Sequence, residues 1–298
     1  KIQRDLDILG SKYPKINSRR TTSLIKTNQN KSICVNGTTN SFNVADSALA
    51  KLFEVLKMPQ GNKTTNPFLL PEWLMKSPKF IKKEFLAALM GCEGDIPKFK
   101  KNLRSPYAIR YRFNKLESLK GNALEYASQI QKLFNGFGIK STVQVREGNI
   151  RKDKQKTIKI QITLSNSNLN LYRFLERIGY EYNYKKIKEA NKILNYIIYK
   201  EEGIRKRDFF YREIIQLKNR GFKTHKAIQI ISKKFKIKPT KIWGLGYSNK
   251  ANHASWLIDS YDKWSKSNKP NLNVKWEKIK DIKIGGKKKY VYDLAVEK

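Results

Sequence analysis

The sequence feature that constrains the fold most is an apolar run, residues 85–92, that is followed by an acid, a glycine and a second acid. In a helix, Ala87 and Gly91 lie four residues apart on one face, and so small a face lets another helix backbone approach closely. Glu93 would lie at the negative end of the helix dipole, yet it would be well placed to hold a divalent cation. The stretch fits either a buried amphipathic helix with a glycine cap or a tightly packed helix that presents a metal ligand.

The charge balance points to a polyanionic partner. The 298 residues include 63 lysines and arginines against 25 acids, a formal net charge of +38. Self-repulsion on this scale is tolerable when the basic surface meets a polyanion, so we expect nucleic acid as the partner rather than a membrane or a small molecule.

Cysteine and histidine usage excludes two classes of site. Cys34 and Cys92 cannot form a disulfide framework or a zinc site. His225 and His253 share no metal-ligand spacing with them and are expected to be plain surface residues. With no transmembrane-length apolar run and no signal peptide pattern, we expect a cytoplasmic protein.

The first sixty residues predict a small mixed unit. Residues 1–9 have helical periodicity, and residues 11–27 are basic and turn-rich. Residues 32–35 and 40–45 alternate like paired strands, with Asn36-Gly37 as the turn between them. Asp46 can cap a helix that runs to about residue 58, with Leu49, Leu52, Phe53 and Leu56 facing inward.

Residues 78–178 predict an α+β unit of helix, two strands, helix, two strands, helix. The helices are expected at 78–94, 121–138 and 169–178, and the strand pairs at 95–101 with 107–114 and at 141–147 with 156–164. In the last strand, Ile158, Ile160, Ile162 and Leu164 alternate with polar residues and should face the core.

The opposite face of this predicted sheet carries cations and amides with almost no acids. Such side chains bond phosphates and read base edges in the major groove, although a solvated sheet face has a similar composition. We expect DNA contact from Arg110, Arg112, Asn114, Gln144, Arg146, Lys159, Gln161 and Thr163.

A basic helical region follows. We expect helices at 183–202 and 205–220 with a break at Gly203. The apolar spacing from 227 to 243 suits a helix-turn-helix, in which Lys238, Thr240 and Lys241 would start the recognition helix. A small helical bundle without groove contact is the alternative. Residues 249–273 read as a linker, and 275–296 as a β-hairpin.

Three ordered blocks resemble one known family. Residues 86–94 read LAALMGCEG, which resembles the LAGLIDADG motif of homing endonucleases, with Glu93 where the family has its metal-binding acid. Gly91 stands at the position of the first, non-catalytic acid. Upstream, residues 70–74 (LPEWL) resemble the block that precedes the second motif in intein endonucleases. Downstream, residues 171–182 (LYRFLERIGYEY) resemble the last helix of the same αββαββα half-domain.

The resemblance implies a site-specific, Mg²⁺-dependent enzyme that cuts double-stranded DNA at a long recognition site and is monomeric as the full-length parent. Glu93 would be the catalytic and metal-binding residue, with Gly94 contributing to the metal site. Family members use two motif helices, each supplying one acid, and residues 1–60 resemble a first half-domain whose motif helix is missing. The basic residue that many members carry near the end of the last strand is replaced by Leu164-Ser165-Asn166, so Lys159 or another lysine would have to serve.

The C-terminal segment resembles part of a domain that has a different activity. Residues 291–296 (VYDLAV) resemble a block of the intein protein-splicing domain, in which Asp293 would match an acid that assists splicing. The terminal His-Asn pair and the N-terminal cysteine of that domain are absent, so the chain resembles an internal fragment of an intein. Archaeal inteins sometimes carry a helix-turn-helix insert. The alternative is a decayed DNA- or RNA-binding module without chemistry, similar to intron maturases.

These inferences give an expected division of the α+β chain. The units are, in order, the remainder of a first LAGLIDADG half-domain (1–60), a linker (61–78), a second half-domain (79–185), a helical, helix-turn-helix-like DNA-binding region (186–250), a second linker (251–274) and the C-terminal part of an intein splicing domain (275–298).

Overall fold

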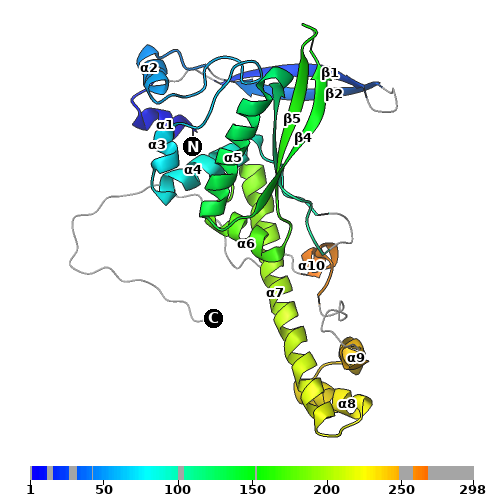
Figure 1. The fold of residues 1–298 in the computed structure, drawn as a ribbon. Helices are drawn as coiled ribbons and strands as arrows, with labels where there is room; N and C mark the ends of the chain where they lie inside the picture. Colours follow the sequence, from blue (N-terminus) through cyan, green and yellow to red (C-terminus); the bar gives the residue numbers. More distant parts are fainter. Residues whose placement is uncertain are drawn as a thin grey trace, which may run out of the picture.

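The computed structural model describes residues 2–11, 16–26, 32–41, 43–99, 104–151, 153–247 and 258–267. It has the expected mixed α+β architecture, in which a long helix, α7, projects from an α+β body and ends at two short helices (Figure 1). The predicted hairpin at 275–296, Asp293 and His253 lie outside the described residues.

The central body is a three-stranded antiparallel sheet covered by helices on one face. The strands are β3 (Arg110–Leu116), β4 (Ser141–Ile150) and β5 (Lys156–Leu164), in the order β3-β5-β4. The helices are α4 (Lys79–Glu93), α5 (Lys120–Gly136), which follows a 3₁₀ turn at Glu117–Leu119, and α6 (Asn168–Arg177).

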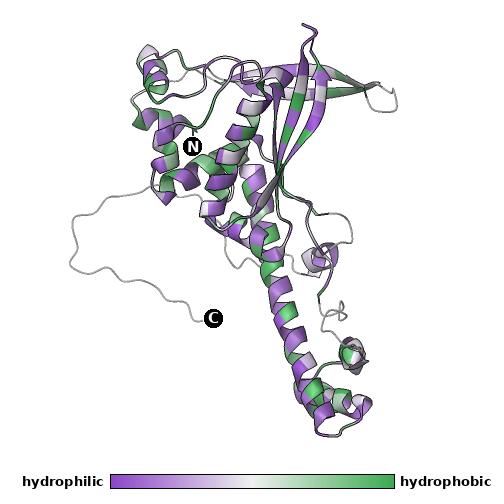
Figure 2. Ribbon diagram, in the orientation of Figure 1, coloured by the Kyte–Doolittle hydropathy of each residue, from purple (hydrophilic) through white to green (hydrophobic). Residues whose placement is uncertain are grey.

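The alternation predicted for the last strand is confirmed. Ile158, Ile160, Ile162 and Leu164 are at most 5% exposed and join the hydrophobic core with residues of α4, α5 and α6. Figure 2 shows the corresponding alternation of hydrophobic and hydrophilic residues along β4 and β5. The sheet therefore has one apolar face against the helices and one polar face.

The strand predicted at 95–101 is wrong where the structure describes it. Residues 94–99 make only isolated bridges, Gly94 with Tyr111 and Phe99 with Pro106. Pro97 has no N–H to donate to a ladder, which explains why the pairing does not extend. The partner strand begins at Arg110 rather than at Tyr107, which is 45% exposed.

The N-terminal region differs most from the prediction. It contains α1 (Ile2–Ile8) and a two-stranded ribbon of β1 (Asn17–Lys26) and β2 (Ser32–Ser41). Most of residues 11–27, predicted as turn-rich, thus form the strand β1. Asn36-Gly37 lies inside β2 instead of forming a turn. The β-branched Thr21 and Thr22 pair with these two residues, and the Thr22 hydroxyl donates to Asn36 Oδ1 at 2.9 Å.

Two helices lead from the ribbon to the central body. In α2 (Ser47–Val55) Asp46 is the N-cap as predicted, accepting from the Leu49 backbone N–H at 3.0 Å. The predicted inward face is wrong beyond Leu49, because Leu52 and Phe53 are 42% and 43% exposed and α2 packs only lightly on the other described elements. A short helix, α3 (Glu72–Lys76), follows within the predicted linker.

The long helix α7 (Tyr184–Asn219) joins two separate hydrophobic cores. The predicted break at Gly203 is wrong: the helix runs through this buried glycine, whose cost of about 1 kcal/mol is small against 36 residues of helix. Ala190, Ile193 and Ile197 pack into the central core, whereas Phe210 and Ile214 pack with the two helices at the far end.

Those far helices are α8 (Thr224–Phe235) and α9 (Pro239–Tyr247), as predicted, with Lys236 in the left-handed conformation between them. A last helix, α10 (Tyr261–Ser267), lies in a stretch predicted as a linker, and stacks Tyr261 on Phe99 with ring centroids 4.0 Å apart. Within the described residues, no helix has the length and apolar character to cross a membrane.

Candidate functional site

The small-residue face of α4 is packed against an extended segment and not against a helix. Ala87 and Gly91 are buried, and the Glu181 N–H donates to the Ala87 carbonyl at 2.9 Å. A Cβ on Gly91 would lie 1.7 Å from the Glu181 carbonyl oxygen, so only glycine fits there. The close approach predicted from the sequence is confirmed, but its partner is the chain that follows α6.

A buried lysine holds the C-terminal end of α4. The Nζ atom of Lys186 lies 3.1, 2.7, 3.4 and 2.6 Å from the carbonyl oxygens of Met90, Gly91, Cys92 and Gly94, and the residue is 5% exposed. The last carbonyls of a helix lack the full set of intrahelical donors, and a cation is favourable at this end of the dipole. The Met90 carbonyl also accepts from the Gly94 N–H at 3.1 Å, and the Gly91 carbonyl from Asn183 Nδ2 at 3.3 Å. Burial lowers the pKa of Lys186, an effect that nearby negative groups, including Glu93, partly oppose.

Sequence reasoning missed Lys186. It occurs in a run of lysines at the start of a basic helix, where nothing in the spacing distinguishes a buried ammonium from a solvated one. Its role depends on the close packing at Gly91, which brings the start of α7 to the end of α4.

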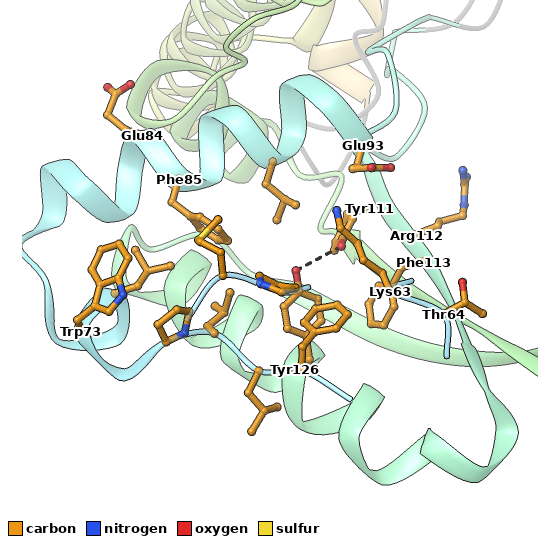
Figure 3. A pocket seen from close by; sticks show the side chains of 18 of the residues that line it. Lys63, Thr64, Trp73, Glu84, Phe85, Glu93, Tyr111, Arg112, Phe113 and Tyr126 are labelled. Carbon is orange, nitrogen blue, oxygen red and sulfur yellow. Dashed lines mark hydrogen bonds between the residues drawn. The ribbon is translucent and has the colours of Figure 1, made fainter. Parts of the chain in front are cut away.

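Glu93, the last residue of α4, has an exposed side chain at one end of a groove of about 660 Å³. Figure 3 shows Lys63 and Arg112 at the same end of the groove, and Glu84 at the other. Apolar side chains of α3, α4, β3 and residues 58–71 line most of its wall. Lys63 was also missed, because it lies in a stretch predicted only as a linker.

Two buried phenols lie in this groove. The hydroxyls of Tyr111 and Tyr126 are 3.4 Å apart, as the dashed line in Figure 3 marks. Burial raises the pKa of both phenols, and the negative charge of Glu93 adds to the effect. Both tyrosines therefore stay neutral.

The acid that directly follows the motif, Asp95, anchors two arginines. Its carboxylate accepts from Arg110 Nε at 2.9 Å and from the two terminal nitrogens of Arg112 at 2.8 and 3.1 Å. Charge-assisted bidentate pairs of this kind fix the plane of a guanidinium. Asp95 is thereby engaged with arginines and leaves Glu93 as the free carboxylate at the end of α4.

The polar face of the sheet brings together the eight residues predicted to contact DNA. Arg112, Gln161 and Gln144 form one row across the three strands, and Asn114, Lys159 and Arg146 form the next. Arg110 and Thr163 pair beside the first row. We call these eight residues the sheet face.

The first row of the sheet face is linked by hydrogen bonds. Arg112 Nε donates to Gln161 Oε1 at 3.1 Å, and Gln161 Nε2 donates to Gln144 Oε1 at 3.3 Å and to Thr163 Oγ1 at 3.1 Å. Arg146 also donates to Gln144 Oε1, at 3.1 Å. Gln161 is only 5% exposed, so it orients its neighbours more than it presents itself to a ligand.

The residues predicted for the recognition helix are far from the sheet face. Lys238 precedes α9 and Lys241 lies in its first turn, both exposed, at the other end of α7 (Figure 1). His225 is exposed on α8, as expected of a surface histidine. Among the described residues, no contact joins this end of the molecule to Glu93, so the predicted sites there form two separate regions.

The described residues offer one good ligand for a divalent cation. In them, no group of three or more histidines, cysteines and acids is close enough to hold a metal. The Glu93 carboxylate suits such an ion as one of several oxygen ligands. The Gly94 carbonyl, the other predicted ligand, already accepts from Lys186 Nζ at 2.6 Å, so a metal there would lie beside an ammonium group.

Comparisons with known proteins match this part of the chain. Residues 81–179, from α4 to the end of α6, match the model of the LAGLIDADG-like domain. No solved structure matches the chain.

Curated relatives match over a limited part of their own length. The RNA polymerase subunit Rpo1N of Methanocaldococcus jannaschii is 32% identical over 207 residues, 70% of this chain and 15% of that protein. The tRNA-splicing ligase RtcB of Methanopyrus kandleri is 33% identical over 158 residues, 53% of this chain and 15% of that protein. The replication factor C small subunit of M. jannaschii is 25% identical over 236 residues, 79% of this chain and 12% of that protein. Together with the domain match, the geometry of α4 supports membership of the LAGLIDADG family for residues 81–179.

Proposed function

We propose that this chain is the endonuclease part of an intein, which cuts both strands of DNA at a long, specific site and requires Mg²⁺. The observation that carries the proposal is the end of α4: an exposed Glu93 on a helix terminus that Lys186 holds in place, beside a cationic sheet face. The LAGLIDADG-like match covers all of these elements except Lys186.

The pattern of relatives supports the intein setting. An RNA polymerase subunit, a tRNA-splicing ligase and a replication factor subunit are each similar to this chain over only 12–15% of their own length. A segment that recurs as a small part of such different proteins has the distribution of an inserted element. Under this proposal, Asp293 belongs to the splicing part of that element.

In the proposed reaction, binding and chemistry are divided between residues. Lysines and arginines of the sheet face, with Lys238 and Lys241, hold phosphates, and the amides of the sheet face read base edges. A bound Mg²⁺ would polarise the scissile phosphate and activate water. Glu93 holds that ion from this chain, a second motif helix supplies another acid, and Lys63 provides a cation at the same end of the groove.

The test is cleavage by the full-length protein that contains this chain. The substrate is a plasmid carrying the uninterrupted host gene, incubated with Mg²⁺ or with EDTA. Glu93→Gln should abolish the cut and leave duplex binding nearly unchanged, because it removes one charge without changing shape. Glu84→Gln is the matched control, since Glu84 lines the opposite end of the same groove and should leave cleavage intact. Cleavage by Glu93→Gln, or loss of DNA binding in it, would contradict the metal role.

A second candidate, a DNA-binding module without chemistry, is favoured by one observation. Asp95 is tied to two arginines, which leaves a single free carboxylate, Glu93, at the motif helix terminus. In that case the full-length protein binds its target with equal affinity in Mg²⁺ and EDTA, and neither strand is nicked.

A further inference from the structure

The outward face of α9 carries two exposed aromatic rings. Trp243 and Tyr247 are 44% and 59% exposed, one helical turn apart, with ring centroids separated by 5.5 Å. On the opposite side, Ile242 and Leu245 are fully buried against α7 and α8. This packing fixes the rotation of the helix, so the rings point away from the core.

Close packing of α8 side chains on Gly246 also fixes the rotation of α9 about its axis. A Cβ at this position would lie 2.7 Å from Ile228 Cδ1 and 2.8 Å from Thr224 Cγ2, both on α8. Lys218 Nζ donates to the Gly246 carbonyl at 3.2 Å, which ties α9 to α7 as well. The two rings are therefore presented by a rigid support.

The charge around these rings is strongly positive. Residues 205–247 contain 13 lysines and arginines and only 2 acids. Both acids are already paired, Asp208 with Arg207 at 2.8 Å and Glu213 with Lys234 at 3.5 Å. The unit thus complements a polyanion, and the exposed Lys238 and Lys241 lie at the start of the helix that carries the rings.

The chemistry of the outward face differs from that of a helix that reads a major groove. Such a helix presents donors and acceptors to base edges, whereas the exposed positions of α9 after its first turn are the rings of Trp243 and Tyr247. Exposed ring faces beside cations are instead the combination that stacks unpaired bases while the cations hold the strand's phosphates.

We propose that the Trp243–Tyr247 face of α9 binds single-stranded nucleic acid by stacking its unpaired bases, with Lys238 and Lys241 contacting the phosphates. This activity goes beyond the proposed cleavage: it uses neither Glu93 nor the sheet face and needs no metal, and it shares only the phosphate-binding Lys238 and Lys241 with the proposed duplex contacts.

The experiment measures binding of the full chain to a thymidine oligonucleotide of about 15 nucleotides and to a duplex of the same length, in EDTA. Trp243→Leu and Tyr247→Leu should each weaken binding of the oligonucleotide by about 5- to 150-fold, with little change for the duplex. Tryptophan emission should be quenched by the oligonucleotide in the wild type, and the quenching should be smaller in Trp243→Leu. Trp243→Phe, which keeps a ring, should retain most of the affinity.

Tyr172→Leu is the matched control, since Tyr172 is an exposed tyrosine on α6, at the other end of the molecule. Unchanged oligonucleotide binding in both α9 variants overturns the proposal. Equal losses for oligonucleotide and duplex also overturn it, because the face would then be a duplex contact. Because both rings are exposed, the variants should fold, and thermal melting of each one checks this.

Discussion

The sheet face and the α8–α9 unit are both cationic, but they differ in how their polar side chains are held. On the sheet face, Asp95, Arg112, Gln161 and Gln144 form a continuous chain of hydrogen bonds across the three strands. On α9, Lys238 and Lys241 are exposed and extend from a short helix. The side chains of the sheet face are preorganised by hydrogen bonds, whereas the lysine side chains at α9 are flexible.

This difference suggests a division of labour in recognition. Side chains that are already oriented lose little entropy on binding and can discriminate between base pairs. Lysines on flexible stems contribute affinity that depends on salt and not on sequence. Among the described residues, the two regions have separate cores to which α7 contributes side chains, so a change in one should have little effect on the other.

The largest expected effect comes from Lys186→Met. This change removes the buried ammonium that donates to the carbonyls at the end of α4 and should destabilise the central body by about 3 kcal/mol. Urea unfolding followed by circular dichroism measures this, with the exposed neighbour changed in Lys185→Met as the control, expected within about 0.5 kcal/mol. Oligonucleotide binding by α9 should survive, since it belongs to the other core. A loss of both properties would show that the two regions are one cooperative unit.

Asp95→Asn should affect the sheet face alone. Removing the carboxylate frees Arg110 and Arg112, at a cost of about 1–2 kcal/mol in stability. The preference for the target over an unrelated duplex should fall about tenfold, while affinity for the unrelated duplex rises slightly because one negative charge is lost. Competition binding measures both. Equal weakening on the two duplexes would contradict the view that Asp95 orients side chains that read bases.

The sequence predicted the central body well because its signals are local. The alternation in 156–164 and the pattern of small residues in 85–92 each determine one face of one element. The strand at 95–101 and the break at Gly203 were wrong because tertiary context overrides propensity there. A proline ends one pairing, and packing carries a helix through a glycine. The ribbon of β1 and β2 was misread because Asn-Gly usually indicates a turn.

The candidate site was predictable only in part for the same reason. Glu93 follows from the motif, and the sheet face follows from the alternation within each strand. Both of these signals lie along single elements. Lys186 and Lys63 could not be found, because each acts at α4 from a segment distant in the sequence. The engagement of Asp95 with arginines likewise depends on how the end of α4 meets β3, which no spacing in the sequence reveals.

Gln161→Leu tests the preorganised row at its centre. The substitution leaves Arg112 Nε without its acceptor, removes one of the two donors to Gln144 Oε1, and should destabilise the protein by about 1–2 kcal/mol. Specificity should relax at one or two neighbouring base pairs of the target and not along its whole length, as a panel of single-base-pair variants would show. Gln131→Leu is the matched control, since Gln131 donates to the Ser141 carbonyl from α5, on the other face of the sheet, and should leave specificity unchanged. Uniform relaxation across the site would argue that the row is only structural.

The smallest effect is expected for the mobile charges of α9. Lys238→Ala and Lys241→Ala should each weaken duplex binding a few-fold, equally for target and unrelated sequences. Each should also reduce the slope of log affinity against log salt by about 1, because one phosphate contact is lost. Affinity measured at several salt concentrations tests this, with Lys223→Ala, an exposed lysine at the start of α8, as the control for general charge. If Lys238→Ala instead lowered the target preference while leaving the salt slope unchanged, this lysine would be reading bases. The contrast between an oriented sheet face and the flexible lysine side chains at α9 would then be wrong.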